Sequence, residues 1–273
     1  MTFDITHPDV QRAVDAALAE DVRSGDITTE ASIPADLQAE ARFVVREELT
    51  LAGVELLELL YPNPVLKMRT GSFTKAGEEI AVVRGSARLL LTRERVSLNF
   101  LQRLSGIATL AARFVEAVAG TGVRILDTRK TTPGLRVLEK MAAAAGGVVN
   151  HRMGLWDAVL IKNNHIRLTG GVRAAVERCR PLGKPVEVEV RTRPEIIEAL
   201  NCGADRLLLD NLTPLEAAEE IRFIAKRAEV EISGGVTLAN VRAYAEAGPD
   251  FISSGSITHS ATAVDINCGI YEI

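Results

Sequence analysis

The sequence has 273 residues, of which 47% are hydrophobic, and its formal net charge at pH 7 is −4. A chain of this length and composition buries a sizeable core, in one large α/β domain or in two of ordinary size. Its mild acidity argues against broad binding of nucleic acid or of anionic membranes, which usually needs a basic face. Recognition of an anion must therefore come from a local cluster of cations.

Targeting and redox signals are sparse. No apolar run approaches the roughly 18 residues of a membrane span, and the first residues, MTFDITHPDV, lack the basic-then-apolar layout of a secretory signal. Cys179, Cys202 and Cys268 lie far apart without a CxxC pair, so neither a disulfide framework nor a zinc site is indicated. We expect a cytoplasmic protein.

The N-terminal part predicts an α+β domain. Apolar residues at helical spacing behind Pro8 predict a helix over 8–20. From about 39 to 90, alternating apolar residues and frequent glycines predict an antiparallel sheet, with a helix near 53–61. Two helical stretches follow, at 93–104 and 108–118, and Ser105-Gly106 is expected to separate them.

The hydrophobic pattern changes in the rest of the chain, where short apolar runs alternate with helical segments. The runs cover 123–127, 157–162, 186–190, 206–210, 230–233 and 251–254, with 146–149 as a candidate seventh. Helix-start signals stand at Thr132-Pro133, Arg193-Pro194, Thr213-Pro214 and Thr237. Repeated βα units predict a parallel sheet, either doubly wound or closed into a barrel.

Polar residues at the ends of the apolar runs favour the barrel. Glu189, Asp210, Ser233 and Ser254 follow one another at separations of 21, 23 and 21 residues, and no GxGxxG follows the first strand. In a barrel such strand ends converge on one mouth. We therefore predict an incomplete, open α/β barrel.

Residues of chemical interest gather at this predicted mouth. The strand ends supply Asp127, Lys162, Glu189, Asp210, Ser233 and Ser254, and adjoining loops supply Arg129, Lys130, His151, Arg152, His165 and His259. One charged residue at a strand end is ordinary, because strands end at the surface. Six in register indicate a site.

The cations predict an anion receptor. Arg129, Lys130 and Arg152 suit a small carboxylate ligand, because a guanidinium meets a carboxylate through two parallel hydrogen bonds. Lys130 also precedes the helix expected at Thr132-Pro133, whose free N–H groups would favour an anion.

The predicted mouth has further candidates. Glu189 and Asp210 suit Mg²⁺ bound together with phosphate oxygens, or a general acid/base pair; the sequence leaves both readings open. The glycine-bearing loops at 233–235 and 253–256 are typical of a phosphate site after late barrel strands, and His259 is a further donor. Lys162 also fits a Schiff-base aldolase, the main mechanistic rival.

The segments DTRKTTPG at 127–134 and NHRMGLWDAVLIKNNHI at 150–166 closely resemble the quinolinate phosphoribosyltransferases, the carboxylating nicotinate-nucleotide pyrophosphorylases. The resemblance begins at GDITT (25–29), continues through RERVSLNFLQRLSGIAT (93–109), EVEV (187–190), LLLDN (207–211) and SGG (233–235), and ends at ISSGSITHS (252–260). It therefore covers nearly the whole chain in order.

The resemblance implies a fold and an assembly. It implies an N-terminal α/β sandwich over 1–105 and an open α/β barrel over 106–273, whose last residues return to the N-terminal domain. Family enzymes are homodimers, or hexamers built as trimers of dimers, in which the N-terminal domain of one subunit covers the barrel mouth of the other.

The resemblance also implies a reaction and a site. The reaction couples quinolinate with 5-phosphoribosyl-1-pyrophosphate (PRPP) in the de novo route to NAD, with Mg²⁺ and no organic cofactor. Its products are nicotinate mononucleotide, pyrophosphate and CO₂. The implied quinolinate ligands are Arg129, Lys130, His151, Arg152 and Lys162, with Arg95 from the neighbouring subunit. Glu189 and Asp210 would hold the metal with PRPP, and its 5-phosphate would meet Ser233, Gly234, Gly255 and His259. The catalytic group would comprise Lys130, Lys162, Glu189 and Asp210.

Some positions depart from the family pattern. The stretch before Asn150 lacks a basic residue and a third glycine, SSGS replaces the commoner VGA before Ile257, and Asn163 stands where Asp is usual. The nearest alternative is a pyrophosphorylase-like relative associated with molybdenum transport, against which HRMGL and LIKNNH argue. A catalytically silent scaffold would be expected to lose one of Arg129, Lys162, Glu189 or Asp210, and the sequence keeps them all.

Overall fold

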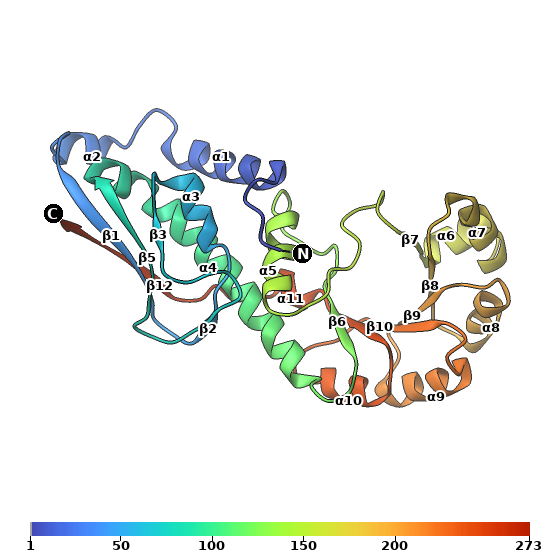
Figure 1. The fold of residues 1–273 in the computed structure, drawn as a ribbon. Coiled ribbons are helices and arrows are strands. Elements are labelled where there is room, and N and C mark those ends of the chain that lie inside the picture. The colour runs from blue at the N-terminus through green and yellow to red at the C-terminus, as the bar shows by residue number, and fades with distance from the viewer. Residues whose placement is uncertain (1) are drawn as a thin grey trace. The chain divides into compact units, whose positions relative to one another are not determined.

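The computed structural model describes residues 2–273 and divides into two compact units, each considered by itself (Figure 1). The first unit holds Met1–Ala112, Lys130–Gly147 and Ile257–Ile273, and the second holds Arg113–Arg129 and Val148–Ser256. Because the units interleave along the chain, they do not test a single boundary at residues 105 and 106, which stays a prediction.

The first unit contains the expected antiparallel sheet. Its strands, in spatial order, are β12 (Ile266–Glu272), β1 (Gln38–Val45), β5 (Glu79–Ser86) and β3 (Val65–Leu66). The predicted alternation is confirmed in β1, where Ala41, Phe43 and Val45 are at most 1% exposed. The C-terminal strand β12 pairs with β1 along its length, and a small ladder joins β2 (Leu49–Thr50) to β4 (Phe73–Thr74).

The first unit also contains several helices shorter than α4 (Ala87–Ala117). They are α1 (Pro8–Val22), α2 (Ile27–Ser32), the 3₁₀ turn η1 (Val54–Leu56), α3 (Leu57–Leu60) and α5 (Arg136–Ala145). The helices predicted at 8–20 and near 53–61 are confirmed. In α1, Pro8 occupies the first turn, where a missing N–H costs nothing, and Val10 and Val14 are buried.

The long helix α4 (Ala87–Ala117) corrects the expectation of two helices separated at Ser105-Gly106. A Cβ on Gly106 would lie 2.1 Å from the carbonyl oxygen of Thr262, so this glycine lets another segment pack against an unbroken helix. Ser105 lies inside the helix, and its Oγ accepts the N–H of Ala52 at 3.0 Å. None of the helices in residues 2–273 is both long and apolar enough to cross a bilayer.

The second unit is the predicted parallel sheet. Its strands are β6 (Arg124–Leu126), β7 (Val159–Ile161), β8 (Val186–Val190), β9 (Arg206–Asp210), β10 (Glu229–Ser233) and β11 (Phe251–Ser253). Their spatial order, β6-β11-β10-β9-β8-β7, places consecutive strands β7 to β11 side by side, as in a barrel, whereas a doubly wound sheet reverses direction. The expected seventh strand at 146–149 is wrong, because Val149 makes only an isolated bridge with Leu126. Within residues 2–273 the sheet has six strands and its edges, β6 and β7, are unpaired with each other, so the barrel is open.

Helices cover the outside of this sheet (Figure 1). They are α6 (Asn163–Thr169), α7 (Val172–Cys179), the 3₁₀ turn η2 (Arg180–Leu182), α8 (Arg193–Asn201), α9 (Pro214–Ile224) and α10 (Val241–Glu246). The predicted starts of α8 and α9 are confirmed, since Thr192 and Thr213 form capping boxes.

Two other predicted helix starts are wrong. Helix α5 begins at Arg136, after a turn at Pro133-Gly134, because Glu139 captures both the N–H and the hydroxyl of Thr132. Helix α10 begins at Val241 rather than at Thr237, whose N–H donates to Asn240 Oδ1.

Candidate functional site

Polar side chains of the second unit converge at the carboxyl ends of its strands, as predicted. Glu189 is the penultimate residue of β8, Asp210 ends β9, and Ser233 ends β10 in register with Asp210. Lys162 directly follows β7. Because parallel strands end at one edge, these residues form a single mouth.

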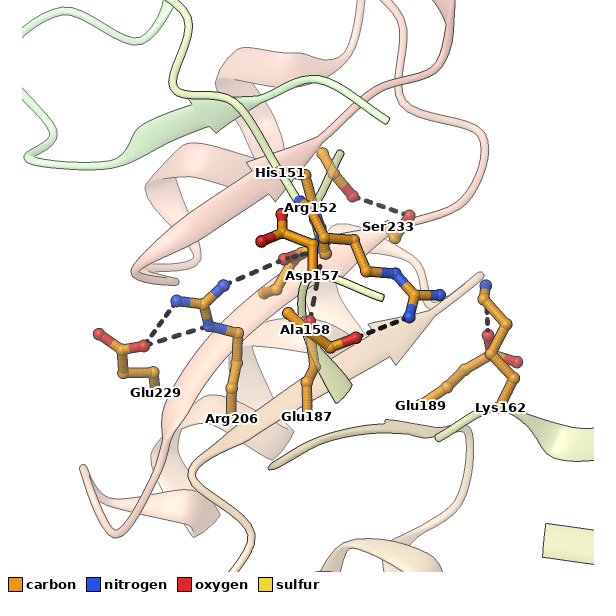
Figure 2. A network of polar contacts seen from close by, with 12 residues as sticks. His151, Arg152, Asp157, Ala158, Lys162, Glu187, Glu189, Arg206, Glu229 and Ser233 are labelled. Carbon is orange, nitrogen blue, oxygen red and sulfur yellow. Dashed lines mark hydrogen bonds and ion pairs between the residues drawn. The ribbon is translucent and has the colours of Figure 1, made fainter. Parts of the chain in front are cut away.

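Three of these side chains, joined by Arg191, form an ion-pair network that we call the mouth cluster: Lys162, Glu189, Arg191 and Asp210. Lys162 Nζ lies 3.1 Å from Glu189 Oε2, and Figure 2 shows the two side chains pointing at each other. Arg191 donates to Asp210 Oδ2 from Nε at 2.9 Å and from Nη2 at 2.5 Å, and its Nη2 lies 3.5 Å from Glu189 Oε1. The cluster lines a cleft of about 570 Å³.

Arg191 was not among the residues singled out in the sequence. Hydrogen bonding to Asp210, opposed by slight burial and reinforced by the charges of Asp210 and Glu189, raises the pKa of its guanidinium above its usual value. A signal was available, because Arg191 lies two residues past Glu189 and side chains alternate along a strand. The cation therefore faces the two carboxylates predicted to hold a metal.

Asp127, the first polar residue of DTRKTTPG, anchors the loop after Asn150. Its side chain is fully buried, and its Oδ1 accepts the N–H of His151 at 2.8 Å while Oδ2 accepts Asn150 Nδ2 at 2.6 Å. Asp127 thereby fixes the backbone from which the side chains of His151 and Arg152 project.

A second network lies deeper along the same strands, and we call it the inner cluster: His151, Glu187, Arg206 and Glu231. His151 Nε2 lies 3.3 Å from Glu187 Oε2 and 3.5 Å from Glu231 Oε2. Arg206 Nη1 lies 3.8 Å from Glu231 Oε2, and its Nη2 lies 2.7 Å from Glu229 Oε2. Figure 2 shows the side chains of His151, Glu187 and Arg206 in this network.

The protonation of His151 reflects two opposing influences. Burial lowers its pKa, but Glu187 and Glu231 outweigh that effect and raise it to about 9. The N–H of Arg152 points at Nδ1 at 2.7 Å, which favours the tautomer protonated on Nε2. In either state the Nε2–H faces the carboxylates, so the ring orientation is fixed.

The inner cluster is better described as an ion-pair network than as a metal site. The ligand atoms of His151, Glu187 and Glu231 lie within 4.8 Å of one another, a spacing that also suits a metal ion. However, Arg206 already brings positive charge to Glu231, and His151 lies against both Glu187 and Glu231, so both carboxylates have cationic partners within the protein.

Glu187, Glu231 and Arg206 were missed in the sequence. The signal for them was the acidic alternation in VEVEV at 186–190 and in EVEIS at 229–233, where glutamates occupy one face of otherwise apolar strands. A buried face that carries carboxylates needs cations opposite it.

Arg152 lies within the electrostatic influence of Arg129. Arg152 Nη1 donates to the carbonyl oxygen of Ala158 at 2.9 Å, and Figure 2 shows its guanidinium extended on the side of Lys162. Burial first, and then the charge of Arg129, lower the pKa of Arg152. Two guanidinium groups that repel each other in this way are suited to share an anionic ligand.

The glycine-bearing loops after β10 and β11 adjoin each other. Ser253 Oγ donates to Ser233 Oγ at 3.0 Å, and Ser254 Oγ donates to the carbonyl oxygen of Val236 at 2.7 Å. Gly234 has φ +92°, and a Cβ there would lie 2.3 Å from Asn211 Oδ1, so glycine is required. Gly255 follows Ser254 and is half-buried.

The remaining predicted residues, Arg95, Lys130 and His259, belong to the first unit. Arg95 is exposed on α4, and His259 ends the short helix α11 (Ser256–His259), with its Nδ1 2.6 Å from Ser260 Oγ. Lys130 does not lie at a helix start, because α5 begins only at Arg136. Their participation in one site with the second unit stays a prediction.

The segments that carry Lys130 and His259 are tied together within the first unit. Thr258 Oγ1 donates to the carbonyl oxygen of Lys130 at 2.8 Å. The Arg103 guanidinium donates to the carbonyl oxygens of Thr258 and Ala261 at 2.6 and 2.8 Å and pairs with the buried Glu139 at 2.9 Å. Lys130 and His259 are therefore held in a fixed relation to each other.

His165, a further candidate from the sequence, has a local role. Its Nδ1 accepts the N–H of Lys162 at 2.9 Å, as part of a capping box at the start of α6. This contact fixes the backbone from which the Lys162 side chain leaves.

The second unit is an open parallel α/β barrel. Its mouth combines cationic side chains, two carboxylates and glycine-bearing loops, which are features that suit small anionic ligands. The family model described as the C-terminal domain of quinolinate phosphoribosyl transferase matches residues 107–268, and the model of its N-terminal domain matches residues 26–105. The chain belongs to the quinolinate phosphoribosyltransferase family.

Individual relatives agree with this assignment. The chain is 40% identical over 295 residues to a chloroplastic carboxylating nicotinate-nucleotide pyrophosphorylase of Arabidopsis thaliana, covering 97% of this chain and 84% of the relative. It is 37% identical over 275 residues to a probable carboxylating nicotinate-nucleotide pyrophosphorylase of Bacillus subtilis, covering 97% and 95%. The crystal structure of NadC from Streptococcus pyogenes superposes with a TM-score of 0.93 at 36% identity, over the full length of both chains.

Proposed function

We propose that the protein transfers the phosphoribosyl group of PRPP to quinolinate, with loss of CO₂, to give nicotinate mononucleotide and pyrophosphate in NAD biosynthesis. The observation that carries this function is the match to carboxylating nicotinate-nucleotide pyrophosphorylases over 97% of the chain. The cations and carboxylates at the barrel mouth are residues of the kinds that these two anionic substrates would need.

The basic residues suit quinolinate, which is a dianion at neutral pH. Arg129 and Arg152 are guanidinium groups whose charges influence each other, and each is able to meet a carboxylate through two hydrogen bonds. Lys162 and His151 add positive charge and a fixed Nε2–H in the same unit. In the proposed complex, Lys130 and Arg95 complete the pocket.

The mouth carboxylates suit Mg²⁺ bound with PRPP. Glu189 and Asp210 offer the hard oxygen ligands that Mg²⁺ prefers, and both touch the guanidinium of Arg191, so one cationic group already spans the two. Bound there, Mg²⁺ would neutralise charge on the ribose-linked pyrophosphate. Ser233, Gly234, Gly255 and His259 are proposed to bind the 5-phosphate, and no organic cofactor is required.

The chemistry then proceeds in two steps. The pyridine nitrogen bonds to the anomeric carbon while the bond to the pyrophosphate oxygen breaks, through an oxocarbenium-like state that the carboxylates stabilise. The carbon–carbon bond to the 2-carboxylate breaks next, CO₂ leaves, and the electron pair is stabilised by the positively charged ring nitrogen. Protonation of the ring carbon completes nicotinate mononucleotide.

The aldolase alternative fits less well. A Schiff-base lysine must present a neutral amine. Lys162 is instead ion-paired with Glu189 at 3.1 Å, and this geometry suits a cation that binds a substrate carboxylate better than it suits a nucleophile. Borohydride reduction with a carbonyl substrate would reveal a covalent adduct on Lys162 if the alternative were correct.

The direct test is formation of nicotinate mononucleotide from quinolinate, PRPP and Mg²⁺, with nicotinate and nicotinamide as competing substrates. We expect product from quinolinate alone. A folded protein that makes none would contradict the proposed function and would favour the pyrophosphorylase-like relative of uncertain substrate.

We further propose a homodimer, alone or within a hexamer, in which Arg95 serves the site of the neighbouring subunit. Its exposure on α4 leaves the guanidinium available to a second chain. Inactive Arg95→Ala and Glu189→Ala chains, when mixed, should recover part of the activity through one intact site per mixed dimer. Mixed dimers without recovered activity would refute the shared site.

A further inference from the structure

Arg191 occupies the position between the two carboxylates at which a metal would be expected. Its guanidinium is 2.5 Å from Asp210 Oδ2 and 3.5 Å from Glu189 Oε1. The carboxylates are largely buried, with side chains 14% and 7% exposed, whereas the Arg191 side chain is 49% exposed. The cation thus covers the carboxylates from the solvent side.

The charges of the mouth cluster balance without a metal. Glu189 and Asp210 contribute two negative charges, and Lys162 and Arg191 contribute two positive charges within hydrogen-bond or ion-pair distance. A bare divalent cation would have to break the contacts of Arg191 with Asp210 before it gained that oxygen as a ligand.

The side chain of Arg191 can leave without disturbing the fold. Its backbone N–H is held by Glu195 Oε2 at 2.8 Å, at the start of α8, so the main chain stays in place while the exposed guanidinium moves. Arg193, two residues further on, differs in this respect. It pairs with Glu220 and stacks over the ring of Phe223 at 4.1 Å, outside the mouth cluster.

We propose that Arg191 is a resident counter-ion that exchanges with the metal at Glu189 and Asp210, so that the site disfavours bare metal and accepts metal together with the pyrophosphate of PRPP. The pyrophosphate brings the negative charge that receives the displaced guanidinium, and a bare cation brings none. This inference rests on the proposed metal site, and it adds a residue that controls when that site fills.

The test measures binding of bare Mn²⁺, an oxygen-seeking stand-in for Mg²⁺, by titration of the full-length protein followed by electron paramagnetic resonance of free Mn²⁺. Arg191→Gln should tighten bare Mn²⁺ binding by about tenfold, equivalent to about 1.4 kcal/mol. Arg191→Lys keeps the charge but loses the forked geometry, so its affinity for bare Mn²⁺ should lie between those of wild type and Arg191→Gln. Arg193→Gln is the matched control and should leave the affinity unchanged.

Asp210→Asn separates this inference from the proposed metal site. If Asp210→Asn abolishes Mn²⁺ binding while Arg191→Gln leaves the affinity at the wild-type value, the metal site stands and the counter-ion role is wrong. If wild type and Arg191→Gln bind no Mn²⁺, with or without PRPP, both fail. Tighter binding in Arg191→Gln that Asp210→Asn removes in the double variant supports both.

Discussion

Glu187 and Glu189 lie two residues apart on β8, with side chains of nearly equal exposure, 8% and 7%, yet their counter-ions differ. In the inner cluster, the side chains of His151 and Arg206 are 11% and 25% exposed. In the mouth cluster, those of Lys162 and Arg191 are 50% and 49% exposed. The same strand therefore carries one carboxylate with enclosed partners and one with partners that reach into solvent.

This difference separates a cluster that supports the structure from a cluster whose cations can be exchanged for a ligand. Enclosed cations cannot be replaced by a substrate without leaving a buried charge unpaired, which is costly. Half-exposed cations hold their carboxylates loosely and can be rehydrated when a ligand takes their place. The inner cluster thus fixes the orientation of His151, whereas the mouth cluster is open to exchange.

The largest expected effect comes from Asp210→Asn in the mouth cluster. In the proposed metal site for PRPP, loss of this charged ligand should lower kcat/KM by about 10²- to 10³-fold. Because Asp210 is paired with half-exposed Arg191, the free energy of unfolding should change by less than about 1 kcal/mol. Steady-state kinetics and urea denaturation check the two values. A strongly destabilised variant would show that the mouth cluster is structural.

Glu231→Gln in the inner cluster should act in the opposite way, chiefly on stability. Glu231 is fully buried between His151 and Arg206, so its neutralisation removes a buried counter-charge from both cations and should cost about 3 kcal/mol. Urea denaturation measures the loss. An unchanged midpoint and slope would contradict the contrast between the two clusters.

The predictable part of the site consisted of residues that end strands or sit in distinctive loops. Glu189, Asp210, Ser233 and Lys162 do converge at one mouth, because parallel strands end together. Glu187, Arg206 and Glu231 were missed because charged residues inside apolar runs were counted as strand, although alternation placed the two glutamates on one face. Arg191 was missed because it lies just past such a run. Their partners come from strands far apart in sequence, which local patterns do not reveal.

The fold was predicted where local signals act alone and was wrong where tertiary contacts override them. Thr192 and Thr213 cap helices as their sequences indicate. Gly106 does not break α4, because the absence of a side chain there is needed for Thr262 to pack against the helix. Thr132 does not start α5, because its donors are taken by Glu139.

The contribution of His151 to stability should depend on pH. Its pKa is raised from 6.5 to about 9, so the stabilisation is fully present below pH 6.5 and is lost as the pH rises through 9. A shift of this size alone corresponds to roughly 3 kcal/mol. The N–H of Arg152 at Nδ1 opposes protonation, so we expect about 1 to 2 kcal/mol.

The measurement compares wild type with His151→Gln by urea denaturation at pH 6 and at pH 10. Glu187, Glu231, Arg152 and Arg206 surround residue 151 in both proteins, so the titrations that do not depend on the imidazole cancel in the difference. The difference in free energy of unfolding between wild type and His151→Gln should be smaller at pH 10 than at pH 6. A gap that widens would mean that His151 is neutral in the folded protein across this range.

The smallest effect is expected for Glu229→Gln, which sharpens the comparison within a single strand. Glu229 and Glu231 both contact Arg206 from β10, but the side chain of Glu229 is 50% exposed and that of Glu231 is not exposed. Water can replace the lost charge at Glu229, so its neutralisation should cost less than about 0.5 kcal/mol. Urea denaturation beside Glu231→Gln tests this directly. Equal losses in the two variants would show that the Arg206 contact, rather than burial of the carboxylate, sets the stability of the inner cluster.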